Sequence, residues 1–218
     1  MTHPSALPHQ AALDAIDRAH LIHPVSPWRV HEQRGPTVLA SGRGAWLTDG
    51  NGHELLDAFA GLWCVNVGYG QESVVQAAAE QMRRLPYATG YFHFSSEPAI
   101  RLAEKLVQIT PASLTRVYLT LGGSEAIDAA VRFIVQYHNA TGRPSKKQFI
   151  SLERGYHGSS STGAGLTALP AFHRGFDLPL PTQHYIESPY AYRHAAGGDP
   201  EALIAASVAA LRAKVAEL

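Results

Sequence analysis

The segment LTLGGSEAID at residues 119–128 constrains the fold most strongly. It reads as an apolar strand, a Gly-Gly-Ser-Glu turn and the beginning of a helix. About thirty residues later, after a second predicted strand at Gln148–Leu152, the chain reads ERGYHGSSSTG. A strand, a helix of about four turns and another strand form a βαβ unit, so we expect parallel strands and a right-handed crossover. The pattern predicts an α/β fold.

The two glycines between strand and helix predict a ligand site. Glycine lets the backbone turn sharply and approach a ligand closely. Free amides at a helix start attract an anion, and the Ser124 hydroxyl adds a donor. We therefore expect Gly123 and Ser124 to bind a phosphate group. The same letters also fit a plain tight turn in which Ser124 is only the helix N-cap, and the motif alone leaves both interpretations open.

The pair Tyr156 and His157 follows the second predicted strand directly. Loops after neighbouring parallel strands meet at one edge of a sheet, where ligands bind. We therefore expect the pair to lie near the phosphate site, where an aromatic ring can stack on a flat heteroaromatic cofactor. Tyr156 also fits the simpler role of a ring that closes the core at a strand end.

The remaining pattern predicts two parts. Residues 1–70 hold an N-terminal segment and a β-hairpin, and residues 71–218 hold the longer helices and the βαβ unit. The resemblance named below implies that these two parts belong to a small domain and to the first part of a large α/β domain. Hydrophobic periodicity and turn residues place the other elements. We expect helices at Ala11–His20, Ser73–Leu85, Pro98–Ile109 and Glu125–Asn139, strands at Val38–Ala40, Ala45–Thr48, His53–Asp57 and Arg116–Leu121, and a last helix from Asp199.

The last helix carries an apolar stripe that we expect to be buried, formed by Ile204, Val208, Leu211, Val215 and Leu218. The stripe runs to the final residue, without a terminator. In a chain that alternates helices and strands, a buried strand is the expected next element. We therefore expect the sequence to stop in the middle of a domain.

Composition excludes several classes of protein. Basic and acidic residues both number 18, so neither nucleic acid nor an anionic membrane is an expected partner. Cys64 is the single cysteine, which fits a reducing compartment. No apolar run is long enough to span a bilayer, and MTHPSALPHQ lacks the features of a secretory signal, so we expect a cytoplasmic protein. His20 and His23 lie in a proline-rich stretch, and we expect no metal site.

Four segments together resemble a known family: GRGAWLTDGNGHELLDAFAGLWCVNVGYG at 42–70, QMRRLPYATGYFHFSSEPA at 81–99, LGGSEAIDAAVRFIVQY at the predicted helix, and RGYHGSS at 154–160. The chain resembles the class III pyridoxal phosphate-dependent aminotransferases of fold type I, in particular the branch that acts on ω-amino acids and amines. Order and spacing agree over nearly the whole chain. Gly122 and Ile127 depart from the residues usual in the family.

The resemblance implies a role for individual residues. Gly123 and Ser124 match the pair that holds the cofactor phosphate. Tyr156 matches the aromatic that stacks on the pyridine ring, with His157 beside it. The resemblance also implies substrate-binding residues: Trp63 as a pocket wall, and Tyr91 and Phe92 in a loop that crosses a dimer interface to line the partner's pocket.

The resemblance implies pyridoxal 5'-phosphate as cofactor, a homodimer with shared active sites, and transfer of an amino group from an amine or ω-amino acid to a keto acid, with pyruvate as the expected acceptor. Such chemistry needs a reactive lysine that forms a Schiff base. The four lysines lie in helices or a loop: Lys105, Lys146, Lys147 and Lys214. In the family the reactive lysine and the aspartate at the pyridine nitrogen come after the position of Leu218. We therefore expect an N-terminal half that lacks catalytic residues of its own.

Two alternatives stay open. The chain can be a truncated, non-catalytic product or a subunit that needs a second chain. It can also be an unrelated nucleotide-binding α/β domain, which predicts an acidic residue about 20 positions after the turn. Glu153 is the nearest candidate, and it lies about thirty residues on.

Overall fold

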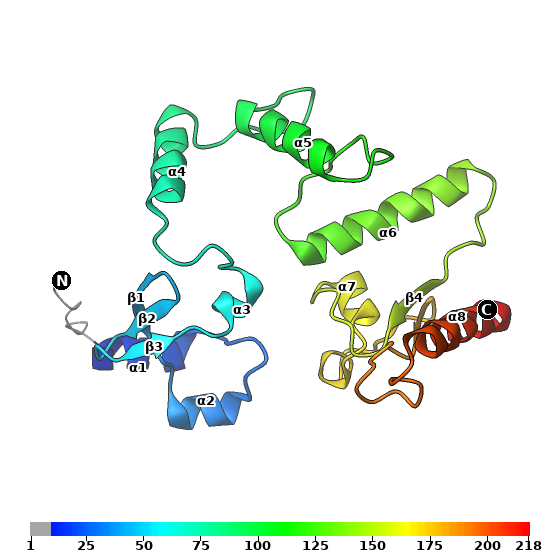
Figure 1. Cartoon of the computed structure of the whole chain (residues 1–218). Coiled ribbons are helices and arrows are strands. Elements are labelled where there is room, and N and C mark those ends of the chain that lie inside the picture. Colours follow the sequence, from blue (N-terminus) through cyan, green and yellow to red (C-terminus); the bar gives the residue numbers. More distant parts are fainter. Residues whose placement is uncertain (1–9) are drawn as a thin grey trace. The chain divides into compact units, whose positions relative to one another are not determined.

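The computed structural model describes residues 10–218. These residues belong to two compact units, Met1–Ile100 and Arg101–Leu218, and α5 (Glu97–Ile109) spans the boundary (Figure 1). The domain boundary predicted at residue 70 stays a prediction. Residues 1–9, most of the segment inspected for a secretory signal, lie outside the described residues. Among the described helices, none has the length and apolar character that crossing a membrane requires.

The first unit begins with two helices, α1 (Gln10–His20) and α2 (Trp28–Arg34). The predicted helix at Ala11–His20 is confirmed by α1. The side chain of Arg18 on α1 donates to the backbone carbonyl oxygens of Glu32 and Gln33 at the end of α2. This contact satisfies carbonyl groups that a helix end leaves without partners, and it joins the two helices.

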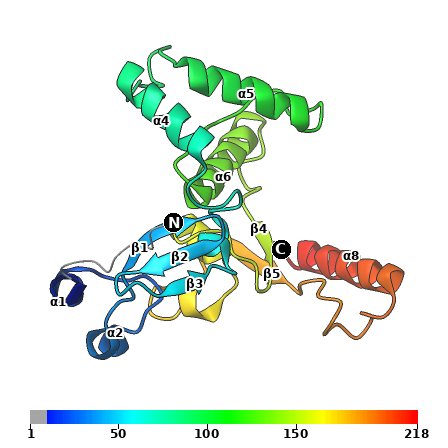
Figure 2. The same cartoon turned by 60° about the vertical axis from the view of Figure 1, so that its left-hand side comes forward.

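A three-stranded antiparallel sheet follows, with β1 (Leu39–Arg43), β2 (Trp46–Asp49) and β3 (Glu54–Leu56) in sequence order (Figure 2). The predicted hairpin and its returning strand are confirmed. The Asp49 carboxylate accepts from the amides of Asn51 and His53 at 2.9 and 2.8 Å, which closes the turn between β2 and β3. The side chain of an aspartate at a turn start commonly makes such bonds.

Three helical segments complete the first unit: α3 (Ala60–Trp63), α4 (Glu72–Arg84) and the start of α5. The predicted helices at Ser73–Leu85 and Pro98–Ile109 are confirmed. The segment α3 is unusual because φ is positive at all four of its residues, with values of 47°, 58°, 59° and 66° along the chain. It is therefore a left-handed turn, a conformation that L-residues rarely adopt.

The second unit contains α6 (Gly123–Ala140) and β4 (Phe149–Leu152), so the predicted helix and the following strand are confirmed. Gly142 follows the helix end with φ 72°, and the amide of Arg143 donates to the carbonyl of His138 at 2.8 Å. Many helices end at a left-handed glycine, with a hydrogen bond from the next amide back to a carbonyl of the last turn. The sequence predicted this helix end.

The predicted strand at Arg116–Leu121 is wrong for this structure. The segment pairs with none of the described strands, and the Leu121 side chain is 98% exposed. A strand needs ladder bonds to a neighbour, which local sequence cannot supply. The segment instead contacts α6 through Tyr118, whose ring meets Phe133 edge-to-face with centroids 5.2 Å apart.

The parallel strand pair consists of β4 and β5 (Gln183–Ile186), so the predicted βαβ unit has the wrong partner strand (Figure 2). Sequence reasoning placed only a loop between β4 and the last helix. That region holds β5, α7 (Ser161–Leu166) and the short 3₁₀ turn η1 (Pro170–Phe172). Small residues dominate α7, and they give no amphipathic pattern to detect.

The last helix, α8 (Pro200–Glu217), begins as predicted. The Asp199 carboxylate accepts from the amides of Glu201 and Ala202 at 3.0 and 3.2 Å, as an N-cap residue does. The prediction that its apolar stripe is buried is wrong, because the short strand β5 covers only part of α8. Between 43% and 63% of the surface is exposed at each stripe residue: Ile204, Val208, Leu211, Val215 and Leu218.

Candidate functional site

The start of α6 offers an anion site. Gly122 is the N-cap residue, and no side chain caps the helix there. Ser124 lies inside the first turn, so the alternative that Ser124 is the N-cap is wrong. A side chain at Gly123 would meet no atom within 4 Å, so the space in front of the helix start is open. Uncapped amides at the start of an 18-residue helix favour a negative group.

The loop after β4 lies directly against this helix start. The amide of Ser159 donates to the Ser124 hydroxyl at 3.1 Å, although the residues are 35 positions apart. Gly158 has φ 117°, and a Cβ built there would lie 2.6 Å from the Ser124 hydroxyl oxygen. Only glycine fits such a close approach at this φ. The structure therefore brings the two sequence motifs together, without the parallel strand pair from which we predicted it.

Asp128 fastens the loop one helical turn further along α6. Its carboxylate oxygen accepts from the Ser160 hydroxyl at 2.9 Å and from the Gly163 amide at 3.2 Å. Residues four positions apart lie on the same helix face, so Ser124 and Asp128 act side by side. One face of α6 thus holds the whole segment that leads into α7.

Thr167 supports the loop from below. It is fully buried, with 0% of its surface exposed. Its hydroxyl accepts from the His157 amide at 2.8 Å and donates to the Gly158 carbonyl at 3.0 Å. Two backbone groups that loop burial would leave unpaired are thereby satisfied. Thr167 thus helps to fix His157 and Gly158, together with the contacts of the loop to α6.

Beneath the loop, α7 is the most buried helix among the described residues. The Gln183 side chain on β5 accepts from the Leu180 amide at 2.9 Å and donates to the Thr162 carbonyl at 3.0 Å. Tyr185 donates its hydroxyl to the Gly165 carbonyl, and burial raises the pKa of the Tyr185 phenol. These bonds tie α7 to β5, so the site rests on the best-packed part of the second unit.

The ring of Tyr156 is available to a ligand, since 54% of its surface is exposed. Its hydroxyl lies 3.1 Å from that of Ser159, and its ring meets Phe172 edge-to-face with centroids 5.6 Å apart. His157 is half-buried beside it. These contacts orient the Tyr156 ring, and both roles considered for it stay predictions.

Trp63 lies in the first unit, at the end of the left-handed turn α3. Its side chain is 70% exposed and meets the Phe59 ring edge-to-face at 6.0 Å. The Asp57 carboxylate organises this turn: it accepts from the amides of Phe59 and Gly61 at 3.1 and 2.7 Å. The same carboxylate accepts the Tyr69 hydroxyl at 2.8 Å.

The hydrogen bond between Tyr69 and Asp57 changes the pKa of both side chains. The hydrogen bond from Tyr69 lowers the pKa of the Asp57 carboxyl, and the backbone amides assist. The same bond raises the pKa of the Tyr69 phenol. Tyr69 also pairs through its backbone with Gly44, between β1 and β2, at 2.8 and 2.9 Å. The turn that carries Trp63 is therefore anchored to the sheet.

Tyr91 and Phe92 lie in the loop between α4 and α5. Their side chains are 76% and 84% exposed, and their ring centroids are 6.1 Å apart. Phe92 and His93 both have positive φ, at 56° and 69°. The substrate-binding role of Trp63, Tyr91 and Phe92 stays a prediction.

Sequence reasoning missed the residues that hold the two separate groups of candidate residues in place: Asp57 and Tyr69 in the first unit, and Asp128, Ser159 and Thr167 in the second. Their spacing gave one signal, because Ser124 and Asp128 are four apart on a predicted helix. Asp57 ends a predicted strand, where a carboxylate often accepts from a turn. Nothing in the sequence indicated Thr167, which acts from beyond a helix that was not predicted.

The residues present fit a phosphorylated, flat cofactor. The uncapped start of α6, the open space at Gly123 and the Ser124 hydroxyl suit a phosphate monoester. The exposed Tyr156 ring, held by the same loop, suits a heteroaromatic plane. The roles of Gly123, Ser124, Tyr156 and His157 in binding it remain predictions.

Comparison with known proteins identifies the family. Residues 29–217 match the family described as aminotransferase class-III. The chain is 38% identical over 185 residues to putrescine–pyruvate aminotransferase of Pseudomonas aeruginosa, covering 85% of this chain and 40% of that protein. It is 42% identical over 159 residues to diaminobutyrate–2-oxoglutarate transaminase of Halomonas elongata, covering 73% and 34%.

Solved structures agree. The omega transaminase from Pseudomonas jessenii in complex with PMP has a TM-score of 0.90 and 36% identity, covering 94% of this chain and 46% of that one. An omega transaminase from Thermomicrobium roseum has a TM-score of 0.88 and 33% identity, covering 95% and 46%. The chain therefore spans less than half the length of these relatives.

Class III aminotransferases use pyridoxal phosphate, and their fold is fold type I. The predicted fold class and the predicted resemblance are both confirmed. The alternative of an unrelated nucleotide-binding domain is excluded by the match over residues 29–217. The chain belongs to the class III aminotransferase family.

Proposed function

We propose that this chain provides the cofactor cradle and one substrate wall of an aminotransferase. The enzyme would move an amino group from an amine or ω-amino acid to a keto acid, with pyruvate as acceptor. The relatives named above include a putrescine–pyruvate aminotransferase, which supports an amine donor and that acceptor. The observation that carries the proposal is the Ser159–Ser124 hydrogen bond at the uncapped start of α6.

The chain's own residues would act by binding and orientation. The first amides of α6 and the Ser124 hydroxyl bind the phosphate of pyridoxal 5'-phosphate, while Tyr156 covers one face of its ring. When bound, this cofactor supplies an electron sink for amino transfer. The His157 amide donates a hydrogen bond to the Thr167 hydroxyl, and this contact would hold His157 beside the bound cofactor. Trp63 would form the apolar wall of the substrate pocket that the family resemblance implies.

None of the four lysines, all of which belong to the described part of the chain, lies at the cofactor cradle formed by the start of α6 and the loop after β4. Lys146 and Lys147 precede β4, whereas the cradle follows the opposite end of that strand. Lys214 on α8 donates to Glu217 at 2.7 Å. Lys105 lies in the middle of α5. We propose that the reactive lysine and the acidic partner of the pyridine nitrogen come from elsewhere.

We further propose a homodimer with shared active sites in the cytoplasm. Tyr91 and Phe92 are almost wholly exposed, and large aromatic side chains in that state often mark an interface. The apolar faces of α6 and α8 are likewise exposed, which fits coverage by further parts of a larger protein. The single cysteine, Cys64, fits a reducing compartment.

A second candidate is that a chain ending at Leu218 exists as such, either non-catalytic or paired with a second chain. The lysine positions fit this candidate and the first one equally. The intact mass of the protein isolated from its source, called the natural protein below, separates the two cases. The second candidate predicts the mass of 23.5 kDa and no lysine adduct after borohydride treatment with the cofactor.

The test of the first candidate is a transaminase assay. The natural protein with added pyridoxal phosphate should convert pyruvate to alanine with at least one donor from a panel of diamines, ω-amino acids and aryl amines. Formation of alanine without an amine donor serves as the blank. If a longer natural protein made no alanine with any donor, the transaminase proposal would fail.

A further inference from the structure

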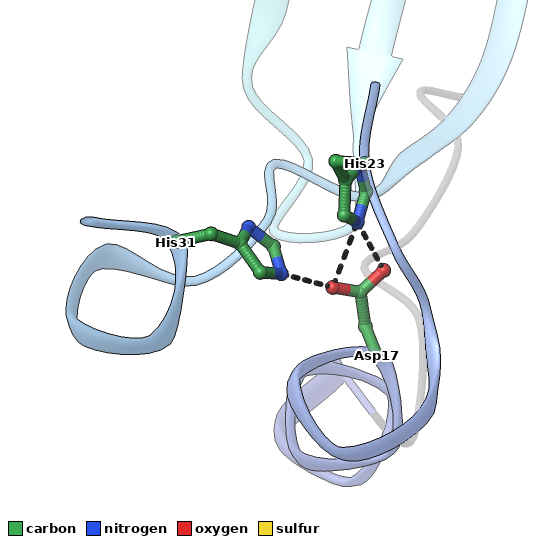
Figure 3. Close-up of side chains that lie close together, drawn as sticks. All are labelled: Asp17, His23 and His31. Carbon is green, nitrogen blue, oxygen red and sulfur yellow. Dashed lines mark hydrogen bonds and ion pairs between the residues drawn. The ribbon is translucent and has the colours of Figure 1, made fainter. Parts of the chain in front are cut away.

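Three side chains from different segments meet at the start of the first unit. Asp17 lies on α1, His23 follows that helix, and His31 lies on α2 (Figure 3). The His23 Nε2 atom lies 3.0 Å from both carboxylate oxygens of Asp17, and the His31 Nε2 atom lies 2.8 Å from one of them. All three potential ligand atoms lie within 4.8 Å of one another.

A contact outside the cluster, made by the Arg18 side chain, joins α1 to the end of α2. Arg18, next to Asp17, donates to the Asp14 carboxylate at 2.9 Å and to the last carbonyl groups of α2. Its charge is therefore directed away from Asp17, toward Asp14 and the end of α2. The same contacts fix α1 against α2, so that Asp17 faces His31.

The imidazole rings of His23 and His31 both point their Nε2 atoms at the Asp17 carboxylate. Their centroids are 4.3 Å apart and their planes are inclined by 39°. Without a cation, both Nε2 atoms must carry protons and donate to Asp17. With a cation, the two nitrogens and one oxygen become three ligands, the combination that zinc binds with a water in fourth place.

The distances between the three side chains suit the replacement of their hydrogen bonds by bonds to a zinc ion. Zinc bonds to nitrogen and oxygen measure about 2.0–2.2 Å, which puts neighbouring ligand atoms of a tetrahedron about 3.3 Å apart. The observed separations of 2.8 and 3.0 Å need to open by only a few tenths of an ångström. The Nε2 atoms of His23 and His31 lie within 4.8 Å of each other, and a bound zinc would hold these two atoms at the same separation of about 3.3 Å.

The surroundings suit a bound cation as well. The side chains of Asp17 and His31 are each 13% exposed, and that of His23 is 32% exposed. A hollow of about 350 Å³ has His23 and His31 in its wall and gives access from solvent. Arg34 lies in the same wall, which favours an anionic fourth ligand, such as hydroxide or chloride.

We propose that Asp17, His23 and His31 form a Zn²⁺ site that joins α1 to α2. Most of this set precedes residue 29, where the family match begins. The sequence argument weighed His20 with His23, but the structure places His31 and Asp17 beside His23. The proposal does not depend on the transaminase assignment, since no residue of the cofactor cradle takes part.

The test is titration of the natural protein with Zn²⁺ by calorimetry after dialysis against a chelator. We expect one equivalent to bind at this site, and Co²⁺ in its place to give the visible absorption of a tetrahedral complex. Asp17→Asn and His31→Gln should each weaken binding at least tenfold. His20→Gln, an exposed neighbour on α1, and His53→Gln, which breaks a simple two-residue bond to Asp49, should leave binding unchanged.

Loss of α1 packing in a variant would confuse that comparison, so a second measurement uses the unmodified protein. In histidine-detected NMR, Zn²⁺ should shift the imidazole signals of His23 and His31 before those of any other histidine. Absence of stoichiometric binding would overturn the proposal. So would binding that both variants retain, or first shifts at other histidines.

Discussion

The Tyr69 hydroxyl donates to the Asp57 carboxylate at 2.8 Å, across the base of the left-handed turn that ends at Trp63. The same carboxylate receives two backbone amides of that turn. An unusual backbone conformation beside a predicted substrate wall is thus held by one acidic side chain. Its protonation state should govern the turn.

The left-handed turn α3 should be stable across a wide pH range, and it should open at both acidic and alkaline pH. The Asp57 pKa is lowered, so its contribution to stability is complete above the ordinary carboxyl value and lost as pH falls through the lowered one. The Tyr69 pKa is raised, so its contribution is complete below the ordinary phenol value and lost as pH rises through the raised one. Trp63 fluorescence should therefore be constant between about pH 4 and pH 10 and change outside that window.

The measurement needs a protein in which Trp28, Trp46 and any tryptophan outside residues 1–218 are replaced by Phe, so that Trp63 is the reporter. Asp57→Asn should abolish the acid limb, and Tyr69→Phe should abolish the alkaline limb. A transition at neutral pH, or limbs that persist in both variants, would show that another group controls the turn.

Ser124→Ala should weaken cofactor binding. It removes a hydroxyl that we expect to donate to a phosphate, and hydrogen bonds to charged groups contribute about 1.5–3 kcal/mol. The dissociation constant for pyridoxal phosphate should rise about 10- to 150-fold, measured by absorbance titration of the natural protein. Ser145→Ala, in the exposed turn before β4, is the matched control. Equal affinities in the two variants would remove Ser124 from the cradle.

Gly158→Ala should destabilise the protein by about 1–3 kcal/mol. The new Cβ would lie 2.6 Å from the Ser124 hydroxyl oxygen, at a φ of 117° that alanine rarely adopts. Urea unfolding measures the change. Gly198→Ala is the control, because a Cβ there meets no atom within 4 Å. The close approach of loop and helix would be disproved if both variants were equally stable.

Thr167→Val keeps the shape of a buried side chain and removes its hydroxyl. The His157 amide and the Gly158 carbonyl would then lose their partner, at a cost of about 1–3 kcal/mol. We expect lower stability in urea and faster hydrogen exchange at the His157 amide. Thr115→Val, at an exposed position, should change neither. Unchanged exchange at His157 would mean that the loop is held by other contacts.

Local sequence patterns predicted most helices and the first sheet, since caps and turns depend on neighbouring residues. Asp199, Gly142 and Asp49 acted as their residue types indicate. Long-range pairing was harder. Arg116–Leu121 has the composition of a strand but pairs with no described strand, and β5 was missed because Gln183 and His184 interrupt its apolar pattern.

The candidate site shows the same division. The glycine, serine and aromatic motifs could be recognised in the sequence, and the structure brings Ser124 and Gly158 together. The side chains that fix them were not predicted, because Asp128 and Thr167 form hydrogen bonds with backbone groups 9 to 35 positions away. Such partners become visible only when the chain is folded.

The left-handed turn α3 couples the size of the predicted pocket wall to its stiffness. Any smaller L-residue at Trp63 enlarges the space, and glycine there would in addition relax the backbone, since it tolerates positive φ. A natural residue can therefore relax this backbone only by removing the whole side chain, so rigidity cannot be changed at constant volume. A D-amino acid, introduced by chemical ligation, would match the mirror-image backbone and keep a bulky ring, so that the two properties could be studied one at a time.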